Sequence, residues 1–303
     1  GEQARANKAA GTPLNTRTIT SELGAVCPTI VVPGPWSDAD IDFQAQQVAS
    51  QKLHNSGFNC VACQVLVLAK DWPQKTAFVN RLEQTMAASE GRRLYYPGAE
   101  ERLAGFTAHN PLAKTLPRAG AAPVTIAPLD AVSDRYSESV EVFAPALSVT
   151  ELDAGDPEAF LRAAITYANQ RLYGTLGANI VIHPKTIAQI GRTRFEEMLI
   201  DLRYGTIAIN TWTGLGFLTP QAAWGAFPGH TLADVQSGIG FVHNTLMFDK
   251  PQRNVVEAPF KTPKPPWFIT NRKGAVLGRL LVNFQHRPSW LKLPRIFLNA
   301  LLG

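Results

Sequence analysis

The chain has 303 residues, of which 45% are hydrophobic and 17% charged, a balance that excludes a disordered or coiled-coil protein and is sufficient for a real core. Three cysteines are too few for a disulfide framework, and an odd number cannot all pair. We therefore expect a reducing compartment and a cytoplasmic protein. The N-terminus shows no targeting pattern, and no apolar run approaches the roughly 18 residues that a membrane-spanning helix needs.

The net charge of +5 is unevenly distributed along the chain. Residues 250–303 hold 10 Lys and Arg against one acid, Glu257, which gives this tail a net charge of +9. Residues 1–249 therefore carry a net charge of −4. The basic character belongs to the tail and not to the body.

Short apolar or β-branched runs alternate with longer helical patterns over the first 210 residues. The runs predict strands at 29–32, 65–69, 124–127, 179–182 and 206–209. The helical patterns predict helices at 39–53, 73–89, 157–172 and 186–201, and Asp156-Pro157 is a clear helix start. Strands that lack a polar face predict an α/β fold in which a mainly parallel sheet is flanked by helices.

Two segments lack a regular pattern. Residues 91–128 are rich in Pro, Gly and Ala and predict an irregular excursion or lid. Residues 250–266 contain five prolines, which we expect to break any regular element. We therefore expect one domain over residues 1–249 and a Pro-rich linker with an extended basic tail over residues 250–303.

Cys60 lies in a Gly-containing turn between a helical pattern and a strand. It could be a nucleophile if a helix start or a cation lowers its pKa, although local sequence alone favours an inert buried thiol. With Cys63 it forms a Cys-x-x-Cys pair, which is also compatible with a redox dithiol. No second close Cys or His pair exists in the sequence, so we expect no metal site.

Two carboxylates are the other candidates. Glu22 precedes the first predicted strand and is compatible with a general base or with a solvated loop acid. Glu141 would share a side with Phe143 if the segment is extended, an arrangement that suits a ribose and a flat ring, or an edge strand with a core Phe. Taken singly, neither residue decides between these interpretations.

Taken in order, five motifs resemble the catalytic half of the aldehyde dehydrogenase superfamily. They are Ser-Glu-Leu-Gly at 21–24, Asn-x-Gly-x-x-Cys at 55–60, Glu-x-Phe-x-Pro at 141–145, Tyr-Gly-Thr-Ile-Ala-Ile-Asn at 204–210 and Ser-Gly-Ile-Gly at 237–240. The resemblance covers about residues 11–243. It outweighs the interpretation of Cys60 as an inert buried thiol and that of Glu22 as a solvated loop acid. It implies an aldehyde dehydrogenase catalytic-domain-like fold.

The resemblance also implies a reaction and a site. Cys60 would attack an aldehyde to give a thiohemiacetal and then a thioester, and Glu22 would activate the hydrolytic water. Glu141 would bind the nicotinamide-side ribose of NAD or NADP, with Phe143 beside it. The family is also usually oligomeric, so the resemblance implies a homo-oligomer.

Departures from the family pattern make this a divergent member. Ala25 and Val26 replace Gly-Lys, Ala144 replaces a Gly, and Phe58 and Val65 alter the surroundings of the nucleophile, so substrate identity cannot be carried over. The resemblance begins just before the general base, without the part that supplies most of the cofactor-binding domain. We therefore expect this chain, by itself, to be an inactive catalytic fragment.

In residues 267–303, apolar clusters are interleaved with basic residues. The pattern suits docking on a partner subunit, which Pro288 and Pro294 favour because they break any long helix, or peripheral contact with a membrane surface. No nucleic-acid-binding motif is recognisable, so nucleic acid is not an expected partner. A non-catalytic scaffold or membrane-surface module on the same fold is the alternative to an enzyme.

Overall fold

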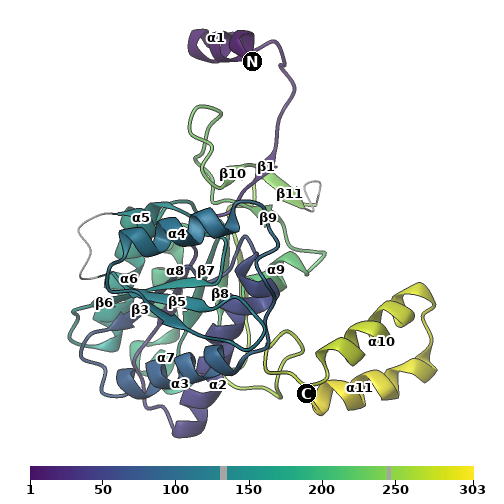
Figure 1. The fold of residues 1–303 in the computed structure, drawn as a ribbon. Helices are drawn as coiled ribbons and strands as arrows, with labels where there is room; N and C mark the ends of the chain where they lie inside the picture. The colour runs from purple at the N-terminus through teal and green to yellow at the C-terminus, as the bar shows by residue number, and fades with distance from the viewer. Residues whose placement is uncertain (130–134, 244–246) are drawn as a thin grey trace.

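The protein is described by a computed structural model that covers residues 1–129, 135–243 and 247–303. Its centre is an eight-stranded sheet with the order β12-β8-β7-β2-β3-β6-β5-β4. Neighbouring strands are parallel except for the antiparallel pair β4 and β5 (Figure 1). The predicted mainly parallel α/β sheet is confirmed.

The central strands are buried on both faces. Every residue of β2, β3, β7 and β8 is buried, as expected for a sheet with helices on each side. The strands span Pro28–Val31 (β2), Val65–Ala69 (β3), Lys114–Leu116 (β4), Val124–Pro128 (β5), Ala146–Leu152 (β6), Gly177–Val181 (β7), Thr206–Ile209 (β8) and Asn254–Glu257 (β12).

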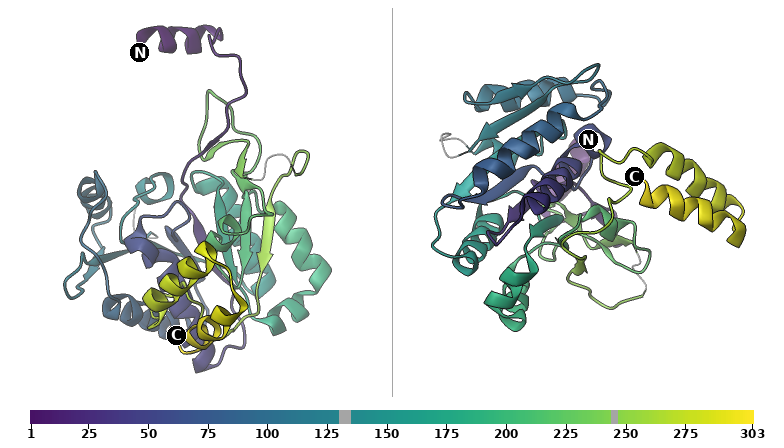
Figure 2. Two further views of the ribbon diagram at one scale, coloured as in Figure 1. Left: turned by 90° about the vertical axis from the view of Figure 1, so that its right-hand side faces the viewer. Right: turned by 90° about the horizontal axis from the view of Figure 1, so that it is seen from below.

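Helices cover both faces of this sheet. The chain steps from β2 to β3 in one direction and from β6 to β7 and β8 in the other, so right-handed crossovers place α2 and α3 on one face and α6, α7 and α8 on the opposite face (Figure 2). The helices span Asp38–Leu53 (α2), Lys75–Ala88 (α3), Ala99–His109 (α4), Tyr136–Ser139 (α5), Pro157–Arg171 (α6), Pro184–Ile190 (α7), Arg192–Asp201 (α8) and Gly214–Phe217 (α9).

The predicted helix starts have a local cause. Asp156 caps α6, because its carboxylate accepts a hydrogen bond from the Ala159 N–H at 2.8 Å and Pro157 follows in the first turn. Ser37 and Asp40 form a capping box at the start of α2, in which each side chain accepts from the backbone N–H of the other.

Three expectations about regular elements need correction. The helix predicted over 186–201 is two helices, α7 and α8, because Gly191 between them has a φ of 91° that no helix accommodates. The segment 91–128, expected to be irregular, contains α4 and β4. The segment 250–266, expected to lack any element, contains β12, which joins the edge of the sheet beside β8. The division of the chain into domains at residue 249 stays a prediction.

Two small antiparallel ribbons lie beyond one edge of the main sheet (Figure 1). In the first, β1 (Ser21–Glu22) pairs with β10 (Gly238–Ile239). In the second, β9 (Trp224–Gly225) pairs with β11 (Phe241–His243). The first ribbon joins segments that are about 200 residues apart in the chain.

The chain ends in a helical hairpin that projects from the body (Figures 1 and 2). It consists of α10 (Gly274–His286), a short 3-10 turn η2 (Trp290–Lys292) and α11 (Leu293–Leu301). The segment before it is fixed to α2, because Phe268 is buried against Phe43 and the Ile269 N–H donates to Ser50 Oγ at 3.0 Å. At the other end, α1 (Glu2–Ala10) has no buried residue.

A search of the described residues for a helix both long and apolar enough to span a membrane finds none.

Candidate functional site

Three segments that enter neighbouring strands bring the predicted site residues together. Glu22 lies shortly before β2, Cys60 shortly before β3 and Glu141 shortly before β6, and these three strands are adjacent in the sheet. Because parallel strands begin at the same edge, the three side chains meet at the amino edge of the sheet. Asn210 follows β8 and therefore lies at the opposite edge, where its Oδ1 accepts from the Ile182 N–H at 2.8 Å.

The turn before Cys60 has an unusual backbone. It includes the 3-10 turn η1 (His54–Gly57), in which Asn55, Ser56 and Gly57 have successive φ values of 53°, 59° and 85°. Asn tolerates this left-handed region and Gly adopts it freely, whereas Ser does so only under strain. Asn55 stabilises the turn, because its amide donates to the Phe58 carbonyl at 3.0 Å.

Gly57 fixes this turn against the segment that carries Glu141. A Cβ at Gly57 would lie 2.6 Å from the carbonyl oxygen of Ala144, so only glycine permits this approach. The glycine of the Asn-x-Gly-x-x-Cys motif thus lies directly against the Glu-x-Phe-x-Pro motif.

The Ser-Gly-Ile-Gly motif holds the segment that carries Glu22. The Ser237 hydroxyl donates to the Gly24 carbonyl at 3.0 Å and accepts from the Thr175 N–H at 2.9 Å. The Leu23 N–H donates to the Ser237 carbonyl at 2.9 Å, and Glu22 pairs with Gly238 across the β1–β10 ribbon. Two motifs more than 200 residues apart therefore form one local structure.

Gly24 brings the two carboxylate segments into contact. The carboxylate of Glu141 occupies the space that a Cβ at Gly24 would fill. Any side chain at this position would displace Glu141, which explains the glycine of the Ser-Glu-Leu-Gly motif.

The Cys60 thiol is partly buried and interacts with Glu22. Burial, followed by the negative charge of Glu22 and hydrogen bonding to its carboxylate, raises the pKa of Cys60 to about 12. The pKa is thus raised and not lowered by a helix start or a cation as the sequence analysis required of a nucleophile; the thiol is protonated at neutral pH, and a carboxylate that could accept its proton lies near it.

Glu141 has a pKa near neutrality. Burial raises the pKa of Glu141 to about 7, and the charge of Glu22 adds to this, whereas the charges of Lys52 and Arg102 oppose it. Atom Oε1 of Glu22 and atom Oε1 of Glu141 are both buried with no hydrogen-bond partner within the part of the chain that the structure describes. Each is thus an acceptor that a bound hydroxyl or water could satisfy.

Lys52, on α2, was missed by the sequence analysis. Its side chain is fully buried, and its ammonium donates to Gln64 Oε1 at 3.3 Å. Burial lowers the pKa of Lys52 to about 8, although nearby Cys63 and Glu141 oppose this shift. The sequence pattern could have predicted this burial, because Lys52 falls eleven residues after Ile41 and so lies on the apolar stripe of the helix.

Phe143 lies in an aromatic group beside the Cys60 turn. Its ring centroid is 5.9 Å from that of Phe58 and 5.0 Å from that of Tyr96. Its φ is 49°, so the chain is not extended here, and the alignment of Glu141 and Phe143 that an extended segment would have given is not formed.

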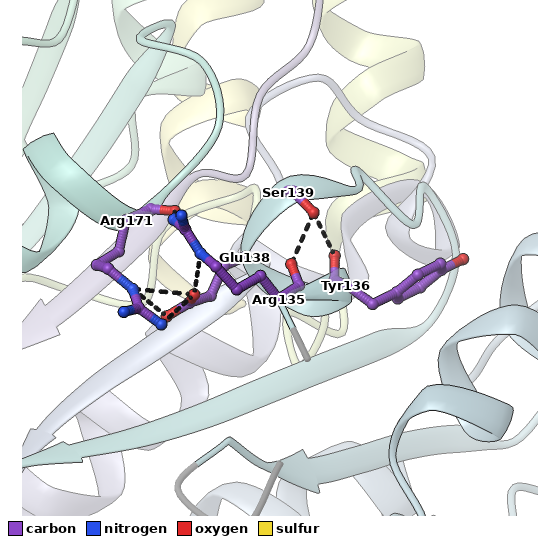
Figure 3. A network of polar contacts seen from close by, with 5 residues as sticks. All are labelled: Arg135, Tyr136, Glu138, Ser139 and Arg171. Carbon is purple, nitrogen blue, oxygen red and sulfur yellow. Dashed lines mark hydrogen bonds and ion pairs between the residues drawn. The ribbon is translucent and has the colours of Figure 1, made fainter. Parts of the chain in front are cut away.

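A network of ion pairs and hydrogen bonds holds the segment just before Glu141 in place (Figure 3). Glu138, on α5, accepts from Arg171 at 2.9 Å and from Arg135 at 3.1 Å. The Glu138 carbonyl accepts from the Tyr173 N–H at 2.8 Å, and the Tyr173 carbonyl accepts from the Val26 N–H at 2.9 Å. These bonds tie the segment before Glu141 to the segment after Glu22.

The geometry does not favour a redox pair. Cys27, Cys60 and Cys63 are all free thiols, and Cys63 is fully buried. Its thiol donates to the Val65 carbonyl at 3.7 Å and has no exposed surface, so it lacks the accessibility of a redox cysteine. Over residues 1–129, 135–243 and 247–303, no group of three His, Cys, Asp or Glu side chains could hold a metal ion.

Comparison with known proteins gives similarity in structure alone. No family model matches the chain, and no curated protein matches it. Solved structures do match, among them gamma-glutamyl-gamma-aminobutyraldehyde dehydrogenase from Burkholderia cenocepacia J2315, with a TM-score of 0.59 and 21% identity over 81% of this chain and 48% of that chain.

Two further matches agree with it. An indole-3-acetaldehyde dehydrogenase in complex with NAD+ has a TM-score of 0.58 and 21% identity over 81% of this chain and 48% of its own. Lactaldehyde dehydrogenase from Escherichia coli has a TM-score of 0.56 and 22% identity over 78% of this chain and 47% of its own. The chain thus has the fold of aldehyde dehydrogenases, as the motifs predicted, and spans about half the length of these relatives.

Proposed function

We propose that the chain is the catalytic half of an NAD(P)-dependent aldehyde dehydrogenase, in which Cys60 is the nucleophile and Glu22 the general base. The observation that supports this best is that the Glu22 carboxylate, brought by a segment from another part of the chain, lies close enough to raise the pKa of the Cys60 thiol, and that both residues were predicted from motifs alone. The aldehyde dehydrogenase fold, found in relatives of 21% and 22% identity, supports the same proposal.

The proposed reaction uses the two residues in turn. The Cys60 sulfur attacks the aldehyde carbon and loses its proton, and the carbonyl oxygen gains one, which gives a thiohemiacetal. A dinucleotide held by Glu141 and Phe143 would supply the hydride acceptor; with loss of the hydride from that carbon and of the hydroxyl proton, a thioester would remain on Cys60. Glu22 then takes a proton from a water that attacks the thioester carbon, the carbon–sulfur bond breaks, and the acid leaves as the thiol regains its proton.

Glu141 and Phe143 are the proposed cofactor contacts. The buried and unpartnered Oε1 of Glu141 fits a hydroxyl donor such as that of a ribose. Phe143, beside Phe58 and Tyr96, offers a flat apolar surface for a ring. Because these are the two contacts proposed on this chain, we expect it alone to bind a dinucleotide too weakly for turnover, and a homo-oligomer remains part of the proposal.

An activated ester tests the nucleophile and base without the cofactor. p-Nitrophenyl acetate acylates a nucleophilic thiol directly, so neither hydride transfer nor a dinucleotide is needed. We expect the chain to release p-nitrophenolate, Cys60→Ala to reduce the rate to the uncatalysed background, and the matched variant Cys63→Ala to retain it.

Equal rates for wild type and Cys60→Ala would show that Cys60 is not the nucleophile. If Cys63→Ala alone abolished the rate, the redox pair would again be the better hypothesis. If no variant differed from the background, the non-catalytic scaffold would be the better account of this fold.

A further inference from the structure

The hairpin of α10 and α11 has two apolar sides, of which one is used within the chain. Leu277 on α10 and Ile296 on α11 are the buried residues of the two helices. Half-buried apolar residues at helical spacing extend each of these inner stripes, namely Leu280 and Phe284 on α10 and Leu293 and Ala300 on α11. The two helices contact each other, and the burial of these stripes indicates that they face one another.

The second apolar side is open. Phe297, Leu298 and Leu301 repeat at helical spacing on α11 and are 61%, 57% and 69% exposed. On α10, Leu281 and Val282 are 41% and 63% exposed. At the end of the hairpin, in η2, Trp290 and Leu291 are 86% and 91% exposed.

Helix geometry places these open stripes on the same side of the hairpin. In each helix the open stripe is rotated from the inner stripe by roughly 120° in the same sense, at 100° per residue. The two helices run antiparallel (Figure 1). If they face each other through their inner stripes, equal rotations direct both open stripes to one side of the hairpin. The opposite side carries Arg279, Asn283 and His286 from α10 and Arg295 and Asn299 from α11.

The charge of this region is uniformly positive. From residue 258 to residue 303 the chain has no Asp or Glu and has eight basic residues, which are Lys261, Lys264, Arg272, Lys273, Arg279, Arg287, Lys292 and Arg295. The preceding body, residues 1–249, has a net charge of −4. A negatively charged partner surface would therefore attract the hairpin and not the body.

We propose that the hairpin is a docking element for an anionic lipid surface. The open apolar side, with Trp290 and Leu291 at the turn, would enter the interfacial region of the bilayer, and Arg287 and Lys292, which lie beside this turn in the chain, would contact anionic headgroups. The charge complementarity favours an anionic lipid surface, because residues 258–303 carry basic residues and no acid. This role is independent of the proposed reaction.

Vesicle co-sedimentation of the full chain tests this proposal. We expect binding to vesicles of phosphatidylcholine with phosphatidylglycerol and little binding to phosphatidylcholine alone, with the difference decreasing at high salt. Leu301→Glu should weaken binding about tenfold or more, because it places a charge on the inserted side. Ile200→Glu is the matched control, since Ile200 on α8 is 68% exposed, and it should bind as wild type does.

A second pair of variants tests the charge. Arg287→Gln, beside the turn that holds Trp290 and Leu291, should weaken binding roughly fivefold, since each cation contributes about fivefold near an anionic surface. Arg203→Gln, on the body, should leave binding unchanged. Arg287 is exposed, so circular dichroism should show the hairpin intact.

Three results would overturn the proposal. One is absence of binding to anionic vesicles, and another is equal weakening by the hairpin variants and their controls. The third is a wild-type oligomer that Leu301→Glu dissociates in size-exclusion chromatography without any vesicle binding, because a second copy would then cover the apolar side.

Discussion

Glu22 acts on Cys60 in two opposing ways. Its negative charge is the largest influence after burial in raising the pKa of the thiol, which keeps Cys60 protonated at neutral pH. As a general base it would also accelerate hydrolysis of the thioester. These two effects can be separated, because the first governs formation of a covalent adduct and the second governs its release.

We therefore predict opposite effects of Glu22→Gln. Removal of the charge lowers the pKa of Cys60, so iodoacetamide should label Cys60 faster at pH 8 than in the wild type. Loss of the base should slow hydrolysis of an acetyl group on Cys60 by about 10² to 10⁴-fold. Glu100→Gln, on α4, is the matched control, and a slower labelling of Cys60 in Glu22→Gln would contradict the electrostatic account.

Glu141 makes stability depend on pH. Its pKa of about 7 in the folded protein exceeds the ordinary value of 4.5, so the unfolded chain ionises first as pH rises. The native state then binds more protons than the unfolded state between about pH 4.5 and pH 7, and stability falls over this window.

We predict that Glu141→Gln removes this loss. The free energy of unfolding of the variant, relative to wild type, should increase between pH 4.5 and pH 7 by an amount on the order of 3 kcal/mol and then stay constant. Urea unfolding of the wild type and the variant at pH 4.5 and pH 8 measures this difference in the free energy of unfolding. A relative stability that does not change with pH would show that Glu141 titrates normally.

At the scale of elements, the site depends on the β1–β10 ribbon. Gly238 has a φ of 119°, and a Cβ there would collide with the backbone of Ser21. Because Glu22, the proposed base, lies in the same ribbon, a shift of β1 would move its carboxylate away from Cys60. The main sheet does not contain either strand, so it should persist.

Gly238→Ala should therefore reduce deacylation of Cys60 while the protein remains folded. We expect a loss of about 1 to 3 kcal/mol in stability from the strained backbone, with the circular dichroism spectrum retained. Gly278→Ala is the matched control, because Gly278 lies on α10 with open space around it. Unchanged deacylation in Gly238→Ala would mean that the ribbon does not position Glu22.

Sequence patterns were sufficient to predict the bounds of some elements and not of others. The fully apolar runs gave β3 and β8 with their observed bounds, because buried parallel strands have no competing pattern. The break at Gly191 was missed, since the apolar periodicity continues through α7 and α8. In α4 and β4, the surrounding Pro, Gly and Ala obscured the weak periodicity of two exposed edge elements.

At the scale of the whole molecule, the site lies at the amino edge of a parallel sheet. Ligands of open α/β sheets usually bind at the carboxyl edge, so strand patterns alone would not have placed Cys60, Glu22 and Glu141 together. The motif resemblance predicted these residues, and the strand order explains how they meet. Neither the strand patterns nor the motif resemblance predicted that Lys52 is buried beside the site, because no motif contains it.

The central claim is that Cys60 and Glu22 act as nucleophile and base, and the site of acylation tests it most directly. Glu22→Gln protein would be treated with p-nitrophenyl acetate, quenched in acid and analysed by peptide mass spectrometry. We predict one acetyl group, located on Cys60, and faster loss of that group in the wild type. An acetyl group on Cys27, Cys63 or lysines, with Cys60 unmodified, would contradict the account.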